Sequence, residues 1–174
     1  MTETIVMLDM TTEARANEIR AFLPPGMIFK HGTARGEAHM KEIIADADYA
    51  IAGQVAVSGD VLRAARKLKL LHKWGVGVDN IDVATARELG VKVAHTTGSN
   101  AVPVAEFALG LMLASLRGIA HGNAVLKTGE WRGPAGLPTP TYLLSGKTVG
   151  VIGFGAIGQR LARILRGFGC AVLY

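Results

Sequence analysis

The chain has too few cysteines for a disulfide or for a metal site built on thiolates. Its 174 residues contain one cysteine, Cys170, which has no partner within the chain. No neighbouring residue is typical of a base that would activate it as a catalytic thiol. We therefore expect Cys170 to be a buried, unreactive side chain, and we expect no metal centre.

Long apolar runs are missing as well. The longest uncharged apolar stretch, from Phe107 to Leu116, is too short to cross a bilayer. The first ten residues contain Glu3 and Asp9, whereas a signal peptide needs a basic stretch followed by an apolar one. These absences predict a cytoplasmic protein with no membrane partner.

Acidic residues are fewer than basic ones, 14 against 19, which gives a formal net charge of +5. The densest basic cluster lies between Arg63 and Lys73, but it contains no aromatic residue and no nucleic-acid motif. Its spacing is typical of the solvated face and the carboxyl end of a helix. We therefore expect no nucleic-acid partner.

What the sequence does contain is a regular alternation of short apolar runs with amphipathic segments. Strands are expected at residues 5–8, 27–30, 49–52, 68–73 and 91–95. Helices are expected at residues 12–22, 37–47, 59–67 after the cap Ser58, and 83–89 between the cap Asp82 and Gly90. Repeated β-α units predict a parallel sheet with helices on both faces, so the first lobe, residues 1–98, should be flavodoxin-like α/β.

A second domain is expected over residues 99–174. It should begin with one long helix from Asn100, the expected cap, to about Lys127. The apolar face of this helix is expected to consist of Val104, Phe107, Leu111, Met112 and Leu116. Residues 129–146 are rich in glycine and proline and predict an irregular arm.

The final segment, KTVGVIGFGAIGQRLARILRGFGCAVLY, has the pattern strand, glycine turn, helix, strand. A run rich in β-branched residues at 148–152 is typical of a strand buried on both faces. The pattern G-x-G-x-x-G follows, and Gly169 stands where it would end the helix. In this strand-to-helix context the pattern predicts the start of a Rossmann dinucleotide-binding domain.

Each glycine of the turn has its own expected use. Gly153 permits a tight turn, Gly155 lets a pyrophosphate approach the backbone, and Gly158 lets the helix pack closely on the strand. Free N–H groups at the helix start favour the anionic phosphates. We predict NAD as the cofactor and leave NADP open. The acidic residue that would bind the ribose hydroxyls of NAD is expected at the end of the strand that follows the helix, where the sequence stops.

A second glycine motif, KWGVGVDNID, covers residues 73–82. It follows a strand, and Gly75 and Gly77 allow successive backbone N–H groups to form a nest suited to a carboxylate or phosphate, with Lys73 as a nearby cation. The alternative is that both glycines serve only a turn, while Asp82 caps the next helix.

Four separated stretches resemble the NAD-dependent D-isomer-specific 2-hydroxyacid dehydrogenase family, in the family's order and spacing. They are GVGVDNID, TTGSNAVPVAEFALGLMLASLR, GEW and SGKTVGVIGFGAIGQRLARIL. The resemblance is detailed over about residues 70–170 and looser before that. It implies a substrate lobe and an NAD domain, and phosphoglycerate dehydrogenase-like or glyoxylate/hydroxypyruvate reductase-like activity on a 2-hydroxy or 2-keto acid.

The resemblance also implies roles for individual residues. Val76 and Gly77 would offer backbone N–H groups to the substrate carboxylate, with Lys73 close by. Val104 would line the nicotinamide pocket, and Val76 would also contact the cofactor. Ala156 and Ile157 would lie against the pyrophosphate. The long helix and the arm around Trp131 resemble the segments through which family members form homodimers.

The reaction implied is hydride transfer between the nicotinamide and C2 of a D-2-hydroxy acid. It needs an arginine for the carboxylate and a histidine oriented by a carboxylate. Family members carry these beyond the segment that matches here, so we expect no catalytic residue in the 174 residues, which alone should be inactive. His72 and His95 match no catalytic position. An NAD-sensing corepressor-like binding protein and a non-catalytic homologue remain alternative hypotheses.

Overall fold

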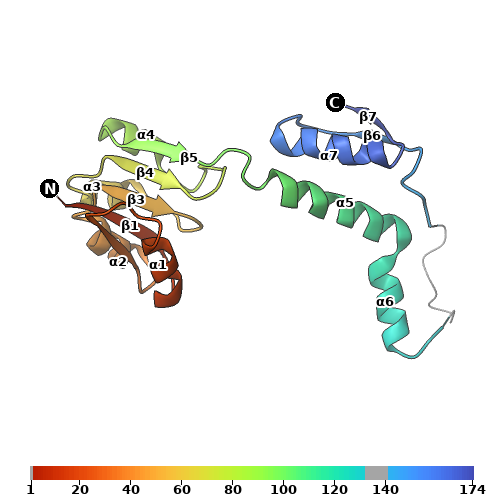
Figure 1. Ribbon diagram of the computed structural model, residues 1–174, viewed down its shortest axis with the longest axis horizontal. Coiled ribbons are helices and arrows are strands. Elements are labelled where there is room, and N and C mark those ends of the chain that lie inside the picture. Colours follow the sequence, from red (N-terminus) through yellow and green to blue (C-terminus); the bar gives the residue numbers. More distant parts are fainter. Residues whose placement is uncertain (1, 132–140) are drawn as a thin grey trace. The chain divides into compact units, whose positions relative to one another are not determined.

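The computed structural model describes residues 2–131 and 141–174, and the chain divides into two compact units, residues 1–97 and 98–174 (Figure 1). Residues 132–140 of the arm predicted at 129–146 therefore lie outside the described residues. Each unit has a hydrophobic cluster of its own.

The first unit contains a five-stranded sheet in the order β2-β1-β3-β4-β5. Every neighbouring pair is parallel. The strands are β1 (Glu3–Met10), β2 (Met27–Gly32), β3 (Tyr49–Ala52), β4 (Leu70–Lys73) and β5 (Lys92–His95). This is the flavodoxin-like strand order, and the predicted α/β fold class is confirmed.

Four helices connect the strands, and two of them begin after the predicted caps Ser58 and Asp82, while Thr12, predicted as the first helical residue, caps a third. The four helices are α1 (Glu13–Arg20), α2 (Glu37–Ile44), α3 (Gly59–Ala64) and α4 (Val83–Glu88). Thr12, Ser58 and Asp82 each accept a backbone N–H from the first turn of α1, α3 and α4, respectively. These caps satisfy amide groups that a helix start otherwise leaves without a partner.

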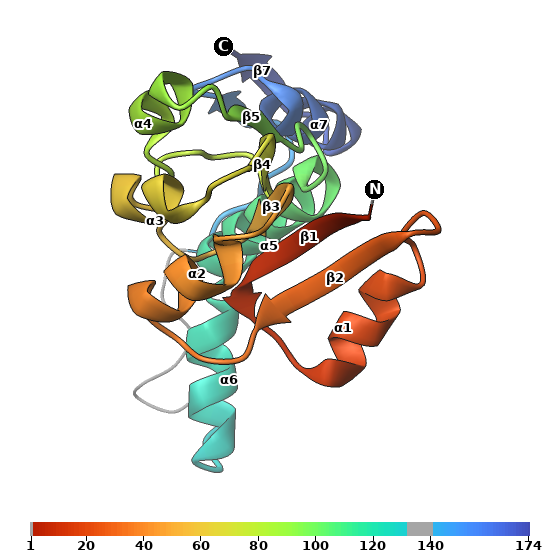
Figure 2. The same ribbon diagram turned by 90° about the vertical axis from the view of Figure 1, so that its left-hand side faces the viewer.

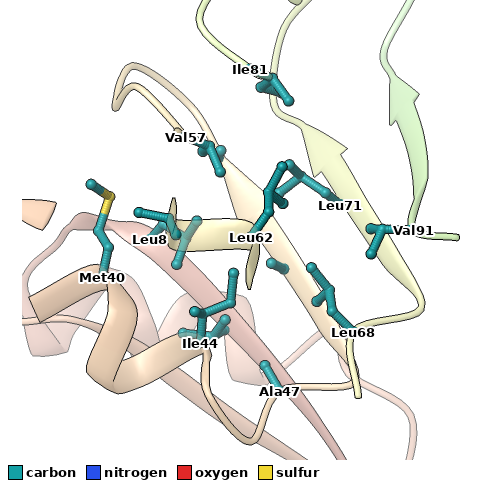
Figure 3. Packing of buried hydrophobic residues seen from close by; sticks show 14 of the residues in the cluster. Leu8, Met40, Ile44, Ala47, Val57, Leu62, Leu68, Leu71, Ile81 and Val91 are labelled. Carbon is teal, nitrogen blue, oxygen red and sulfur yellow. The ribbon is translucent and has the colours of Figure 1, made fainter. Parts of the chain in front are cut away.

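The two faces of the sheet are covered unequally. Side chains alternate along each strand, and Leu8 and Leu71 lie on the face that packs with Ile44 of α2 and Leu62 of α3 (Figure 3). The opposite face is only partly buried. Figure 2 shows α1 beside β2, away from α2 and α3. The prediction of helices on both faces is confirmed, with α1 covering one part of its face.

Ion pairs and hydrogen bonds connect the amino ends of β1, β3 and β4. The Asp48 side chain is 7% exposed and accepts hydrogen bonds from the Thr4 backbone N–H at 2.9 Å and the Lys67 ammonium at 2.8 Å. Lys69 lies 3.2 Å from Asp48 and 2.6 Å from Glu3. Lys67 first, then the Thr4 N–H, hold the pKa of Asp48 far below its ordinary value of 3.8. Two residues of the predicted solvated cluster are thus paired.

This lowered pKa predicts a dependence of stability on pH. The contribution of ionised Asp48 is complete above its unfolded-state pKa and is lost as the pH falls toward the lower folded-state value. We expect Asp48→Asn to be less stable than the parent at neutral pH and to lose less stability between roughly pH 5 and pH 2. Urea unfolding across this pH range measures the free energy of unfolding of both proteins. Asp46→Asn, which removes a carboxylate from an exposed ion pair, is the control. Equal pH dependence in parent and Asp48→Asn would contradict the assignment.

The second unit departs from the predicted single long helix. Two helices are present, α5 (Ala101–Arg117) and α6 (Ile119–Lys127), with a bend of 62° between them. Gly118 has a φ of 63° and ends α5 in the left-handed conformation that glycine adopts readily. The predicted Asn100 cap is also wrong in one respect, because its side chain makes no capping hydrogen bond.

The rest of the second unit is β6 (Thr148–Gly150), α7 (Ala156–Gly167) and β7 (Ala171–Leu173), with β6 and β7 parallel. Its core contains Leu165 of α7 and Cys170, and Cys170 is buried as predicted. The helix α5 packs on this core through Leu109, Met112, Leu113 and Leu116.

Two predictions about burial in the second unit are wrong. Phe107 and Leu111, assigned to the packed face of α5, are 67% and 55% exposed. Ile152, assigned to a strand buried on both faces, lies beyond β6 and is fully exposed. Within the described residues, the β6-β7 pair is a two-stranded sheet, so it has no further strands to shield these positions. No single helix in the described ranges is long and apolar enough to span a bilayer.

Candidate functional site

The glycine turn lies between β6 and α7, as the motif predicts. Gly153 has a φ of 91°, which side chains rarely adopt. A Cβ on Gly158 would lie 2.3 Å from the carbonyl oxygen of Gly153 and 3.2 Å from Val151. Gly158 is therefore required for the close approach of α7 to the strand, and Gly153 for the turn itself.

Neither the backbone conformation nor a close contact with any described residue requires glycine at position 155. The φ of Gly155 is −76°, a conformation open to any residue, and a Cβ there would meet no described atom within 4 Å. Gly155 also stands at the cap position of α7, so it supplies no side chain to the free N–H groups of the first turn. The open space beside a bare backbone and a helix start fits a pyrophosphate, which needs this close approach.

The second glycine motif forms the loop after β4 in the first unit. Val76 and Gly77 are exposed at this carboxyl edge of the sheet. Lys73, the last residue of β4, is only 8% exposed. Its ammonium donates to the carbonyl oxygen of Gly53 and, at 2.8 Å, to the Oδ1 of Asn80. An ammonium has three N–H groups, so one donor remains after these two bonds.

The loop after β3 is fastened to the loop after β4 by two side chains. Asn80 donates through Nδ2 to the carbonyl oxygen of Val55 at 2.7 Å, and Lys73 donates to the neighbouring Gly53. On the other side, the Asp9 carboxylate accepts the N–H groups of Gly53, Gln54 and Val55. Three strand ends therefore position these loops, at the edge where α/β sheets bind ligands.

Sequence reasoning missed the roles of Asp9 and Asn80. In the sequence alone, Asp9 is only a charge near the amino terminus and Asn80 is only one residue of the motif KWGVGVDNID. A signal was present for Asp9, since an acidic residue at the end of a buried strand can accept N–H groups of a neighbouring loop. Its partners lie 44 to 46 residues away, so no local pattern identifies them.

The predicted site residues fall into two groups. Lys73, Val76 and Gly77 lie together on the first unit, while the glycine turn with Ala156 and Ile157 lies on the second. Val104, half-buried, stands in the first turn of α5 in the second unit. In the described ranges, no group of three or more histidine, cysteine, aspartate or glutamate side chains is arranged to hold a metal ion.

The first unit has a parallel sheet with a two-glycine loop at its carboxyl edge, and the second has a glycine turn of the dinucleotide-binding type. Together these features indicate an α/β protein of the dehydrogenase kind. Comparison with protein families identifies it further: residues 5–166 match the catalytic-domain model of D-isomer-specific 2-hydroxyacid dehydrogenases. The chain belongs to that family.

Similar proteins support this membership. Hydroxypyruvate reductase from Thermotoga maritima is 44% identical over 117 residues, covering 67% of this chain and 37% of that protein. D-3-phosphoglycerate dehydrogenase from Methanocaldococcus jannaschii is 39% identical over 142 residues, covering 81% of this chain and 26% of that protein. The chain thus spans well under half the length of these two relatives.

A solved structure agrees with the fold of the described chain. NAD-dependent formate dehydrogenase from Staphylococcus aureus, in complex with NAD, superimposes with a TM-score of 0.82 and 31% identity. The match covers 97% of this chain and 55% of that one.

Proposed function

We propose that the protein carrying this chain is an NAD-dependent oxidoreductase of D-2-hydroxy acids and 2-keto acids. The observation that carries the proposal is the presence of two features in one family member: an exposed loop at Val76 and Gly77 after β4, and a glycine turn whose Gly155 meets no described contact that would require glycine. The first suits a carboxylate and the second a pyrophosphate. Proteins named hydroxypyruvate reductase and D-3-phosphoglycerate dehydrogenase are among the relatives of this chain.

On the substrate side, the backbone N–H groups of Val76 and Gly77 bind the carboxylate of the 2-keto acid. We propose that the remaining N–H of Lys73 donates to the same carboxylate, while its other two bonds keep the loops in place. These hydrogen bonds would fix the acid end of the substrate. Phosphoglycerate, glyoxylate and hydroxypyruvate all carry the carboxylate that this loop recognises.

On the cofactor side, Gly155, Ala156 and Ile157 hold the pyrophosphate through backbone N–H groups at the start of α7. Val104 lines the nicotinamide pocket, and Val76 contacts the same ring. Bound NAD supplies the hydride acceptor in one direction and, as NADH, the donor in the other. The arginine and the carboxylate-oriented histidine that the reaction needs are not placed among the 174 residues, which alone are inactive.

We also propose a homodimer formed through α5, α6 and the adjoining arm. Large apolar side chains on these segments are exposed in the described structure, and they are Phe107, Leu111, Ile119, Leu126 and Trp131. Exposed apolar groups of this density are typical of surfaces that another chain covers.

Mass measurements test the extent and assembly of the active protein. We expect the protein that shows activity to have an intact mass well above 18.3 kDa. Its native mass should be twice the intact mass of its own chain. An intact mass of 18.3 kDa with full NADH-dependent activity would contradict the proposal that the catalytic residues lie outside this segment.

A further inference from the structure

An aromatic stack joins the glycine turn to the residue that follows β7. Phe154 stands between Gly153 and Gly155, and Tyr174 follows β7 directly. Their ring centroids are 4.0 Å apart and their planes are inclined by only 13°. The rings meet just beyond the paired strands, where the Val151 N–H donates to the Leu173 carbonyl at 2.8 Å.

Phe154 is held from a second side as well. The Nε2 of Gln159 in α7 donates to the carbonyl oxygen of Phe154 at 3.1 Å. The ring is therefore held by β7 and the backbone by α7. Both contacts act on the one residue of the turn that lies between two glycines, which are the residues with the greatest backbone freedom to lose.

Burial in a core does not force this contact. Neither ring belongs to the described hydrophobic core of the second unit, which contains Leu144, Leu165 and Cys170. The stack also spans two places with distinct uses in a dinucleotide-binding unit. The turn contacts the pyrophosphate, and the end of the second strand lies next to the adenosine ribose.

We propose that Tyr174, by stacking on Phe154, is a positioning residue that holds the glycine turn in the conformation that binds the dinucleotide. This rests on the proposed function, since it concerns NAD binding by the same site. The stack fixes the turn before the cofactor arrives, so the ordering of Gly153 and Gly155 does not weaken binding. Tyr174 acts through Phe154 and needs no contact of its own with the cofactor.

The test is NADH binding by calorimetry, with the purified protein that carries this chain. An aromatic pair contributes enough to raise the Kd for NADH by about two- to twelve-fold when it is lost. We expect this increase in Tyr174→Ala and Phe154→Ala, and near-parental binding in Tyr174→Phe, which keeps the ring. Phe22→Ala, at an exposed aromatic residue of the first unit, is the control and should bind normally.

The double variant Phe154→Ala/Tyr174→Ala should bind about as weakly as either single variant, because each removes the same stack. Unchanged affinity in Tyr174→Ala, an equal loss in Tyr174→Phe, or additive losses in the double variant would overturn the positioning role. Absence of NADH binding in the unaltered protein would overturn the proposed function as well, so the two failures are distinguishable.

Discussion

Gly155→Ala is expected to lose most of its affinity for NADH while keeping its folding stability. Gly158→Ala should lose both affinity for NADH and folding stability. At Gly155 the φ is ordinary and no described atom lies within 4 Å of the new methyl group, so the protein itself has room for it. The methyl would occupy the space through which a pyrophosphate approaches the backbone. We expect the Kd for NADH to rise roughly tenfold or more, which corresponds to about 1.4 kcal/mol.

The comparison with Gly158 makes this result diagnostic. A methyl at Gly158 would stand 2.3 Å from the backbone oxygen of Gly153, so α7 must move away from the strand. Overpacking of this kind costs about 1–3 kcal/mol of folding stability. Urea unfolding and NADH titration of both variants measure the difference. Normal NADH affinity in a stable Gly155→Ala protein would contradict the assignment of this turn to the pyrophosphate.

Lys73→Met is expected to raise the KM for the 2-keto acid by about 10- to 100-fold with little change in the KM for NADH. A hydrogen bond to a charged group is worth about 1.5–3 kcal/mol, and the variant loses the ammonium that we propose donates to the substrate carboxylate. Stability should fall too, because the carbonyl of Gly53 and the side chain of Asn80 lose their donor. Steady-state kinetics with varied keto acid and varied NADH separate the two KM values.

Two further variants show whether Lys73 acts on substrate or only on the loops. Asn80→Ala breaks the same connection between the loops but keeps the ammonium, so its KM for the keto acid should rise less than that of Lys73→Met at a comparable loss of stability. Lys92→Met removes an equal charge from an exposed position on β5 and should behave as the parent. Equal KM values in Lys73→Met and Asn80→Ala would mean that Lys73 has a purely structural role.

Much of the fold follows from local pattern. The strand at Tyr49–Ala52 has the predicted bounds, and Ser58 and Asp82 cap the helices predicted after them. These features depend on neighbours within a few residues, which the sequence displays directly. The break at Gly118 was missed because the apolar pattern continues across it, and one glycine within a helix costs only about 1 kcal/mol.

The site was less predictable, because its contacts join distant parts of the chain. The glycine motifs predict two anion-binding loops, but they do not show that Lys73 is paired within the protein. Its partner Gly53 lies 20 residues away and belongs to a loop with no motif of its own. Lys69 was assigned to a solvated face for the same reason, since its partner Glu3 is 66 residues away. Contacts between residues this far apart in the sequence depend on the order of the strands in the sheet, which the local pattern does not specify.

The most direct test of the central claim is turnover by the purified protein that carries this chain. NADH oxidation is followed by absorbance with hydroxypyruvate, glyoxylate and phosphohydroxypyruvate as substrates, and the product is resolved by chiral chromatography. We expect NADH-dependent reduction of at least one of these acids, with the D-isomer as the product wherever C2 becomes chiral. Tight NADH binding without any reduction would contradict the proposal of an active dehydrogenase, and an L-product would contradict the assigned stereochemistry.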